Sequence, residues 1–199
     1  MCETGPAVNP VPIGGTPQCR MTPYEEETPL PYAPEQDHDR AFLDQAIAQS
    51  RRSLDPGTKK PFGAVVVVGG EVVGVGSNCV VEDCDPTAHA EVVALRDAGR
   101  RLGTFLVEGG TLYSSCEPCP MCLTACYWAG ISRLVYAADR HDAARNGHPD
   151  LQFYRELALP NGERRLLDEV PVEGDVRAAA VGVLAEWAAE QPGPVEPKL

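Results

Sequence analysis

Two short motifs in this chain combine the residue types that a catalytic metal site needs. They are His-Ala-Glu at residues 89–91 and Pro-Cys-Pro-Met-Cys at residues 118–122. One imidazole and two thiolates, from His89, Cys119 and Cys122, form a ligand set that binds Zn²⁺ well. A catalytic zinc site keeps one coordination position for water and needs a nearby group that moves protons. Glu91 remains free for that task, so the motifs predict a zinc centre that activates water.

A structural zinc site is the alternative for the same cysteines. Such sites usually close with four ligands, and Cys116 is the candidate for the fourth. We expect Cys116 to end a strand rather than lie on the helix of Cys119 and Cys122, and a closed site would leave Glu91 without a role. Cys126 is expected to pack in the core, as free cysteines often do.

Two helices must bring the ligands together. Apolar residues at helical spacing predict one helix over residues 88–101 and another over residues 120–129. His89 opens the first helix, while Cys119 and Cys122, three residues apart, place both sulfurs on one face at the start of the second. Helix N-termini favour negative charge, so we expect them to favour the thiolate forms.

The remaining elements predict a sheet covered by helices. A first helix is expected from Asp37 or Asp39, with Phe42 and Leu43 on its apolar face. Gly69-Gly70 indicates a tight hairpin between the first two strands. The predicted strands are 62–68, 72–75, 111–114 and 134–137. Strands that alternate with helices after an initial hairpin predict an α/β sandwich with a mixed sheet.

The pattern is weaker beyond Asp139. We expect a short helix at 150–157, an edge strand at 166–170 and a terminal helix at 175–190. One face of the terminal helix carries apolar residues that include Leu184 and Trp187. Because such a face is rarely left exposed, we expect this helix to pack against the core or a partner subunit.

Composition divides the chain into three parts. Residues 1–36 are rich in Pro, Gly, Thr and Glu and are predicted to be a disordered extension, residues 37–191 the ordered domain, and residues 192–199 a disordered tail. The net charge of −12 opposes a nucleic-acid partner. No run approaches the length of a membrane-spanning helix. The first residues form no apolar targeting segment, so we expect a cytoplasmic protein.

The motifs resemble those of the cytidine deaminase superfamily, and within it those of the bacterial guanine deaminases. An H-x-E followed by P-C-x-x-C is the signature of zinc-dependent base deaminases. The resemblance is carried by residues 85–91 and 115–122, and it is sharpened by segments 61–65, 127–129, and 137–139 with 142–144 close behind. It covers roughly residues 42–154, which is most of the chain that we expect to be ordered.

The resemblance implies a three-layer α/β/α sandwich with a mixed central sheet, a homodimer, and zinc as the cofactor. It implies hydrolysis of guanine, a small-molecule purine, to xanthine and ammonia. It also implies a set of site residues, with metal ligands His89, Cys119 and Cys122, catalytic Glu91 and Asp150, and substrate contacts Phe62, Asn78 and Ala90.

The residues themselves leave other roles open for several of these positions. Phe62 begins a buried strand, so core packing is as good an account as ring stacking. Asn78 ends the second strand, where a turn role is common, although its amide could contact a base edge. Asp150 could cap a helix. For His141 and His148, in the loop before it, we expect surface or capping roles.

Alternative functions follow from one departure. The guanine deaminases that the chain resembles end in a tyrosine that covers a neighbouring active site, whereas this chain has no tyrosine after Tyr154. Guanosine, cytosine or a triazine could therefore be the substrate of the same core. A tRNA-adenosine deaminase is opposed by the acidic charge and the absence of a basic C-terminal helix. A non-catalytic zinc module is the alternative outside enzymology.

Overall fold

The computed structural model describes residues 37–54, 60–160 and 162–191. The predictions for residues 1–36 and 192–199 therefore lie outside the described residues. The described chain divides into two compact units, residues 37–158 and residues 159–191, so the expected domain of residues 37–191 spans both. Within these ranges, no helix has the length and the apolar character that crossing a membrane requires.

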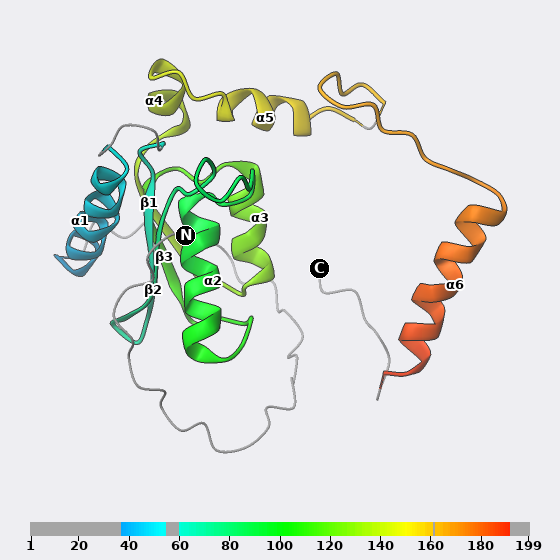
Figure 1. Cartoon of the computed structure of the whole chain (residues 1–199), viewed down its shortest axis with the longest axis horizontal. Helices are drawn as coiled ribbons and strands as arrows, with labels where there is room; N and C mark the ends of the chain where they lie inside the picture. The colour runs from blue at the N-terminus through cyan, green and yellow to red at the C-terminus, as the bar shows by residue number, and fades with distance from the viewer. Residues whose placement is uncertain (1–36, 55–59, 161, 192–199) are drawn as a thin grey trace. The chain divides into compact units, whose positions relative to one another are not determined.

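The first unit contains a four-stranded mixed sheet (Figure 1). Its elements are α1 (Asp37–Arg52), β1 (Gly63–Val68), β2 (Glu71–Ser77), α2 (Ala90–Leu102), β3 (Thr111–Cys116), α3 (Pro120–Trp128), β4 (Arg133–Ala138), α4 (Arg140–Arg145) and α5 (Asp150–Leu157). The strand order is β2-β1-β3-β4. Strand β1 is antiparallel to β2 and β3, and β3 is parallel to β4, which confirms the predicted mixed sheet.

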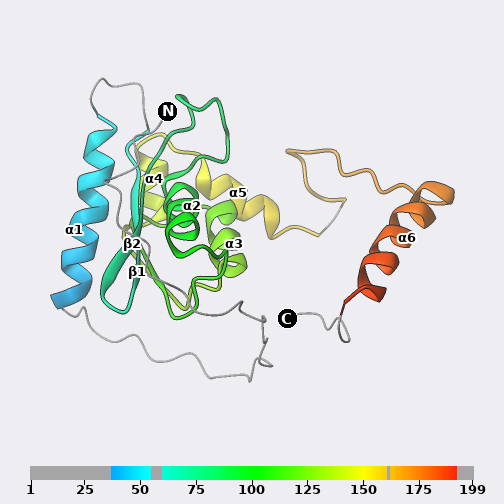
Figure 2. The ribbon, with the colours of Figure 1, turned by 60° about the horizontal axis from the view of Figure 1, so that its bottom comes forward.

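Helices cover both faces of this sheet, with α1 on one side and α2 and α3 on the other (Figures 1 and 2). Strand β1 shows why two covering layers are needed. Val65 and Val67 pack with Phe42 of α1, whereas Ala64 and Val66 pack with Ala94 of α2. Successive strand residues point to opposite faces, so an all-apolar strand must be covered on both. The three-layer α/β/α prediction is confirmed.

Two glycines in β2 let helix α2 lie directly on the sheet. A Cβ atom added at Gly76 would lie 2.1 Å from the carbonyl oxygen of Ala90, and one at Gly74 would lie 2.3 Å from that of Ala94. No side chain fits in this space, so glycine is required for the close approach. The contact fixes the first turn of α2, and with it the position of His89.

The region after Asp139 differs from the prediction in two places. Helix α4 was not expected; it is held by a capping box, in which the Asp139 side chain accepts hydrogen bonds from the backbone N–H groups of His141 and Asp142 and the Asp142 carboxylate accepts one from the Asp139 N–H. The strand expected at 166–170 was wrong, because that segment pairs with no other strand among the described residues.

The second unit contains the predicted terminal helix as α6 (Asp175–Ala189). None of its residues is buried, and the exposed side chains include Leu184 and Trp187. The expectation that this face packs against the core or a partner subunit stays a prediction.

A buried polar group ties α1 to the sheet. Asp39 is only 5% exposed, and its Oδ1 accepts a hydrogen bond from the Tyr113 hydroxyl at 2.8 Å. The Arg133 guanidinium donates to both carboxylate oxygens at 2.6 Å. A buried carboxylate is stable only when it is paired in this way. Burial, helped by the hydrogen bond to Asp39, raises the pKa of Tyr113 to about 12.

We expect Tyr113→Phe to lower the free energy of unfolding by about 1–3 kcal/mol, because the Asp39 carboxylate loses a buried donor. The raised pKa means that the folded state holds the phenolic proton longer than the unfolded state does. The contribution of Tyr113 to the free energy of unfolding is therefore complete below pH 10 and is lost as the pH rises toward 12. Urea unfolding at pH 7 and at pH 9.5 to 11 tests this. The control is Tyr127→Phe, whose side chain is 70% exposed; an equal loss in both variants would contradict the assignment.

Candidate active site

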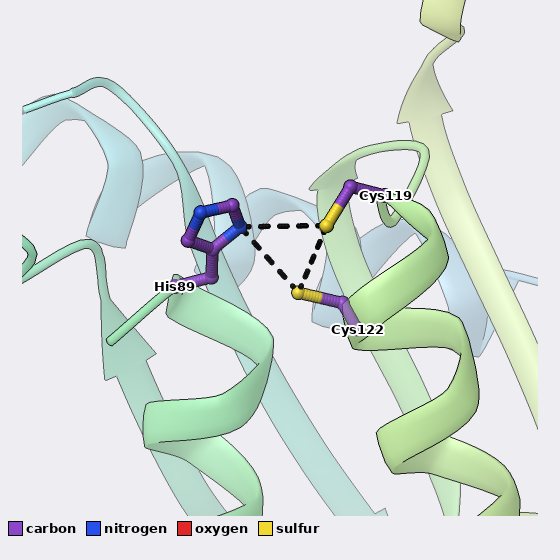
Figure 3. A group of neighbouring side chains, drawn as sticks. All are labelled: His89, Cys119 and Cys122. Atoms are coloured by element: carbon purple, nitrogen blue, oxygen red, sulfur yellow. Dashed lines mark hydrogen bonds between the residues drawn. The ribbon is translucent and has the colours of Figure 1, made fainter. Parts of the chain in front are cut away.

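The three predicted metal ligands meet at the starts of two helices (Figure 3). His89 is the N-cap residue of α2, and Cys119 is that of α3, with Cys122 in the first turn that follows. His89 Nδ1 lies 3.6 Å from each of the two sulfurs, and the sulfurs lie 3.6 Å from each other. Neither N-cap side chain makes a capping hydrogen bond to the backbone of its helix, so both are available to bind a metal.

This triangle fits zinc. Tetrahedral coordination with Zn–S near 2.3 Å and Zn–N near 2.1 Å places neighbouring ligand atoms about 3.6–3.8 Å apart. The hydrogen bond that the two sulfurs share, with a further contribution from His89, lowers the pKa of Cys119 to about 4. The same shared bond raises the pKa of Cys122. The lowered pKa favours the thiolate form of Cys119, and binding a metal through both sulfurs would require the loss of the Cys122 proton as well.

The closed structural site finds no support among the described residues. Cys116 is not part of the metal-ligating group, and its thiol points to the Asp139 carbonyl oxygen at 3.8 Å. Cys126 is 2% exposed and belongs to the core cluster between the sheet and α2, which confirms its expected packing role. The fourth coordination position is left for water or substrate.

Glu91 lies in the first turn of α2, beside the ligands. It is only 4% exposed. Its Oε1 accepts a hydrogen bond from the Ser114 hydroxyl at 3.1 Å, and its Oε2 accepts one from the Cys122 thiol at 3.4 Å. Burial raises the pKa of Glu91 above its usual range. A raised pKa makes this carboxyl group a stronger base, which suits a group that takes a proton and later returns it.

A cavity of about 290 Å³ opens at this centre. It brings together six of the eight predicted site residues, namely Phe62, Asn78, His89, Glu91, Cys119 and Asp150. Cys122 is fully buried behind the surface of the cavity. Ala90 is also fully buried and packs in the core, so it does not line the cavity, and its substrate contact stays a prediction.

Asn78 combines the two roles that the sequence left open. Its Oδ1 accepts a hydrogen bond from the Val80 N–H at 3.3 Å, which is a turn contact. Its Nδ2 is buried in the wall of the cavity and has no hydrogen-bond partner in the described structure. A buried donor without a partner is costly, so this amide is a natural contact for a ligand acceptor.

Phe62 and His148 form an aromatic side of the cavity. Phe62 precedes β1, and its ring meets that of His148 edge to face, with centroids 4.7 Å apart. The surface or capping role expected for His148 was therefore wrong, whereas His141 is exposed on α4. Burial is the main cause that lowers the pKa of His148, which favours a neutral ring beside the cavity.

Asp150 is the first residue of α5, and the N-cap position belongs to Pro149. Its half-buried carboxyl lines the cavity, and burial and the nearby Cys119 thiolate raise its pKa. The sequence reasoning missed Lys60 and Glu117, which also line the cavity. Glu117 immediately precedes the cysteine motif of residues 118–122, and that proximity was the available signal.

Comparison with known proteins supports this geometry. A family model for the cytidine and deoxycytidylate deaminase zinc-binding region matches residues 36–138. The guanine deaminase of Bacillus subtilis is 44% identical over 125 residues, which cover 63% of this chain and 80% of that protein. A tRNA-specific adenosine deaminase of Aquifex aeolicus is 40% identical over 97 residues, 49% of this chain and 64% of that protein. The crystal structure of guanine deaminase from Bacillus subtilis superimposes with a TM-score of 0.70 at 38% identity, covering 76% of this chain and 96% of that one.

We expect the purified protein to contain about one zinc ion per chain, and Cys119→Ala or Cys122→Ala to lose it, because two protein ligands hold the ion poorly. Zinc should also be released as the pH falls, since the Cys122 thiol regains its proton. Elemental analysis after dialysis measures both effects. Cys126→Ala, which removes a core thiol outside the ligand set, should retain the metal. Full zinc in both ligand variants would contradict the assignment.

Proposed function

This chain belongs to the cytidine and deoxycytidylate deaminase family and is a hydrolase of carbon–nitrogen bonds in cyclic amidines, and on that premise we propose that it converts guanine and water to xanthine and ammonia. The observation that best supports guanine as the substrate is the buried Nδ2 of Asn78, a residue of the cavity wall, which has no hydrogen-bond partner in the described structure. Guanine presents acceptors at N7 and O6, which such a donor can bind. The similarity to the guanine deaminase of Bacillus subtilis supports the same substrate.

The residues of the site divide the work of hydrolysis. His89, Cys119 and Cys122 would hold a zinc ion, which would lower the pKa of a bound water molecule to about 7. Glu91 would take a proton from the attacking water and give it to the amino group that leaves the ring as ammonia. Its raised pKa suits both transfers, and the Ser114 hydroxyl holds its Oε1 in place.

The remaining cavity residues orient the substrate. Phe62 offers an aromatic surface to the purine ring. Asp150 reaches the same cavity from α5, and we assign its carboxyl to the departing amine. Holding the reacting groups in this geometry is itself a large part of catalysis. The homodimer that the resemblance implies stays a prediction.

A second candidate is deamination of adenosine in tRNA, which the similarity to the enzyme of Aquifex aeolicus favours. Binding an anticodon loop requires positive charge along the RNA backbone, and the net charge of −12 opposes it. Deamination of tRNA, with affinity that falls steeply as salt rises, would establish this second candidate instead.

We expect Glu91→Gln to lower kcat for guanine by about 10²–10⁴-fold while the zinc content stays near that of the natural chain, because glutamine cannot carry the proton. Ammonia release and elemental analysis measure the two quantities. Glu108→Gln, at an exposed position, is the matched control. Ammonia from cytosine or adenosine, with none from guanine, would contradict the proposed substrate.

Asn78→Ala should lower kcat/KM for guanine by about 10–100-fold through loss of the donor to the base. Asn78→Asp separates the two roles of this residue, because it retains an oxygen for the Val80 N–H and replaces the donor by a negatively charged acceptor oxygen. Its loss should be at least as large as that of the alanine variant. Steady-state kinetics with thermal unfolding as a folding check measures this; wild-type kcat/KM in the aspartate variant would exclude base contact by Asn78.

A further inference from the structure

Helix α5 carries Asp150 to the cavity, although no side chain of this helix is fully buried. None of its eight residues is buried. A helix whose side chains are at most partly buried gains limited stability from packing, and such segments open locally at low free energy. Something other than the core must therefore hold Asp150 where the substrate is bound.

Tyr154 supplies one attachment. It lies four residues after Asp150, and residues at this spacing lie on the same face of a helix. Its hydroxyl donates a hydrogen bond to the carbonyl oxygen of Pro118, the buried residue immediately before Cys119. The helix of Asp150 is thereby joined to the loop that presents a zinc ligand.

Arg140 supplies the second attachment. Its guanidinium lies over the Tyr154 ring, with Cζ 3.8 Å from the centroid, which is cation–π geometry. The same guanidinium donates to the Glu117 carboxylate through Nε, at 3.0 Å, and through Nη2. The Arg140 backbone N–H donates to that carboxylate at 2.9 Å. The Arg140 side chain thus contacts both Glu117, which precedes the cysteine motif, and the Tyr154 ring of α5.

We propose that Arg140 and Tyr154 are positioning residues that clamp α5 to the loop of residues 117–119 and so fix Asp150 relative to the zinc ligands. The assignment of Asp150 to the substrate amine rests on the proposed function. The clamp itself rests on the contacts of Glu117, Arg140 and Tyr154. Both residues act through Asp150, and neither touches the reacting atoms.

The test combines kinetics with amide hydrogen exchange. Arg140→Ala and Tyr154→Phe should lower kcat for guanine by about 10–100-fold, the scale of loss that follows a misplaced group of about 1 Å. Zinc content should be unchanged. In an Asp150→Asn background the same substitutions should cost at most about 2-fold, since residues that act through one group are not additive. Arg155→Ala, at an exposed position of α5, should be silent in both backgrounds.

Hydrogen exchange separates the clamp from the substrate. Amides of α5 should exchange faster in Arg140→Ala and Tyr154→Phe than in the natural chain and in Arg155→Ala. If the natural chain does not deaminate guanine but the amides of α5 exchange faster in the two variants, the proposed function is refuted and the clamp is supported. Unchanged α5 exchange, or kinetic losses that add fully to that of Asp150→Asn, overturns the clamp.

Discussion

The structure depends on bringing one imidazole nitrogen and two sulfurs to mutual distances of 3.6 Å. Two of these ligands occupy N-cap positions, where Ser, Thr, Asp or Asn would normally accept hydrogen bonds from the helix. Neither makes such a bond, and the absence of a good N-cap costs a helix about 0.5–2 kcal/mol. Tertiary packing must compensate, and the close seat of α2 on Gly74 and Gly76 is the clearest example.

The site also explains a change of polarity along β3. The side chains of Leu112, Ser114 and Cys116, at every second position, lie on the same face of this strand. Leu112 packs in the apolar core, whereas the Ser114 hydroxyl donates a hydrogen bond to the carboxyl group of Glu91. The face therefore turns from apolar to polar toward the carboxyl end of the strand. Ligands of open α/β sheets bind beyond the carboxyl ends of the strands. The change from apolar to polar residues along β3 therefore indicates at which end of the strand the site lies.

Sequence reasoning reached the parts of the molecule that local patterns encode. The grouping of His89, Cys119 and Cys122, the hairpin at Gly69-Gly70 and the all-apolar β1 depend on spacing and residue type, and the structure contains all three. The confirmed layers follow from the need to cover both faces of β1. Helix α4 was missed because six residues are too few for an apolar period, and its signal lies only in the Asp139 and Asp142 capping box.

The residues that complete the cavity were harder to predict, because their roles depend on distant partners. His148 lines the cavity where its ring packs against that of Phe62, a residue far away in the chain. Glu117 and Arg140 are joined across 23 residues, and no spacing rule marks that pair. The strand expected at 166–170 failed for the converse reason, since a strand exists only where another strand accepts its hydrogen bonds.

The distribution of the ligands along the chain has a consequence for the order of folding. The β1–β2 hairpin and α2 are contiguous and bring only His89 and Glu91, while both sulfurs follow 30 or more residues later on α3. These sulfurs reach His89 in a fold where β3 pairs with β1, and such non-local pairings form slowly. A nascent chain that has reached only α2 thus holds a single ligand. Tight metal binding therefore requires that β3 and α3 have already joined the sheet, so it cannot assist formation of the β1–β2 hairpin and α2.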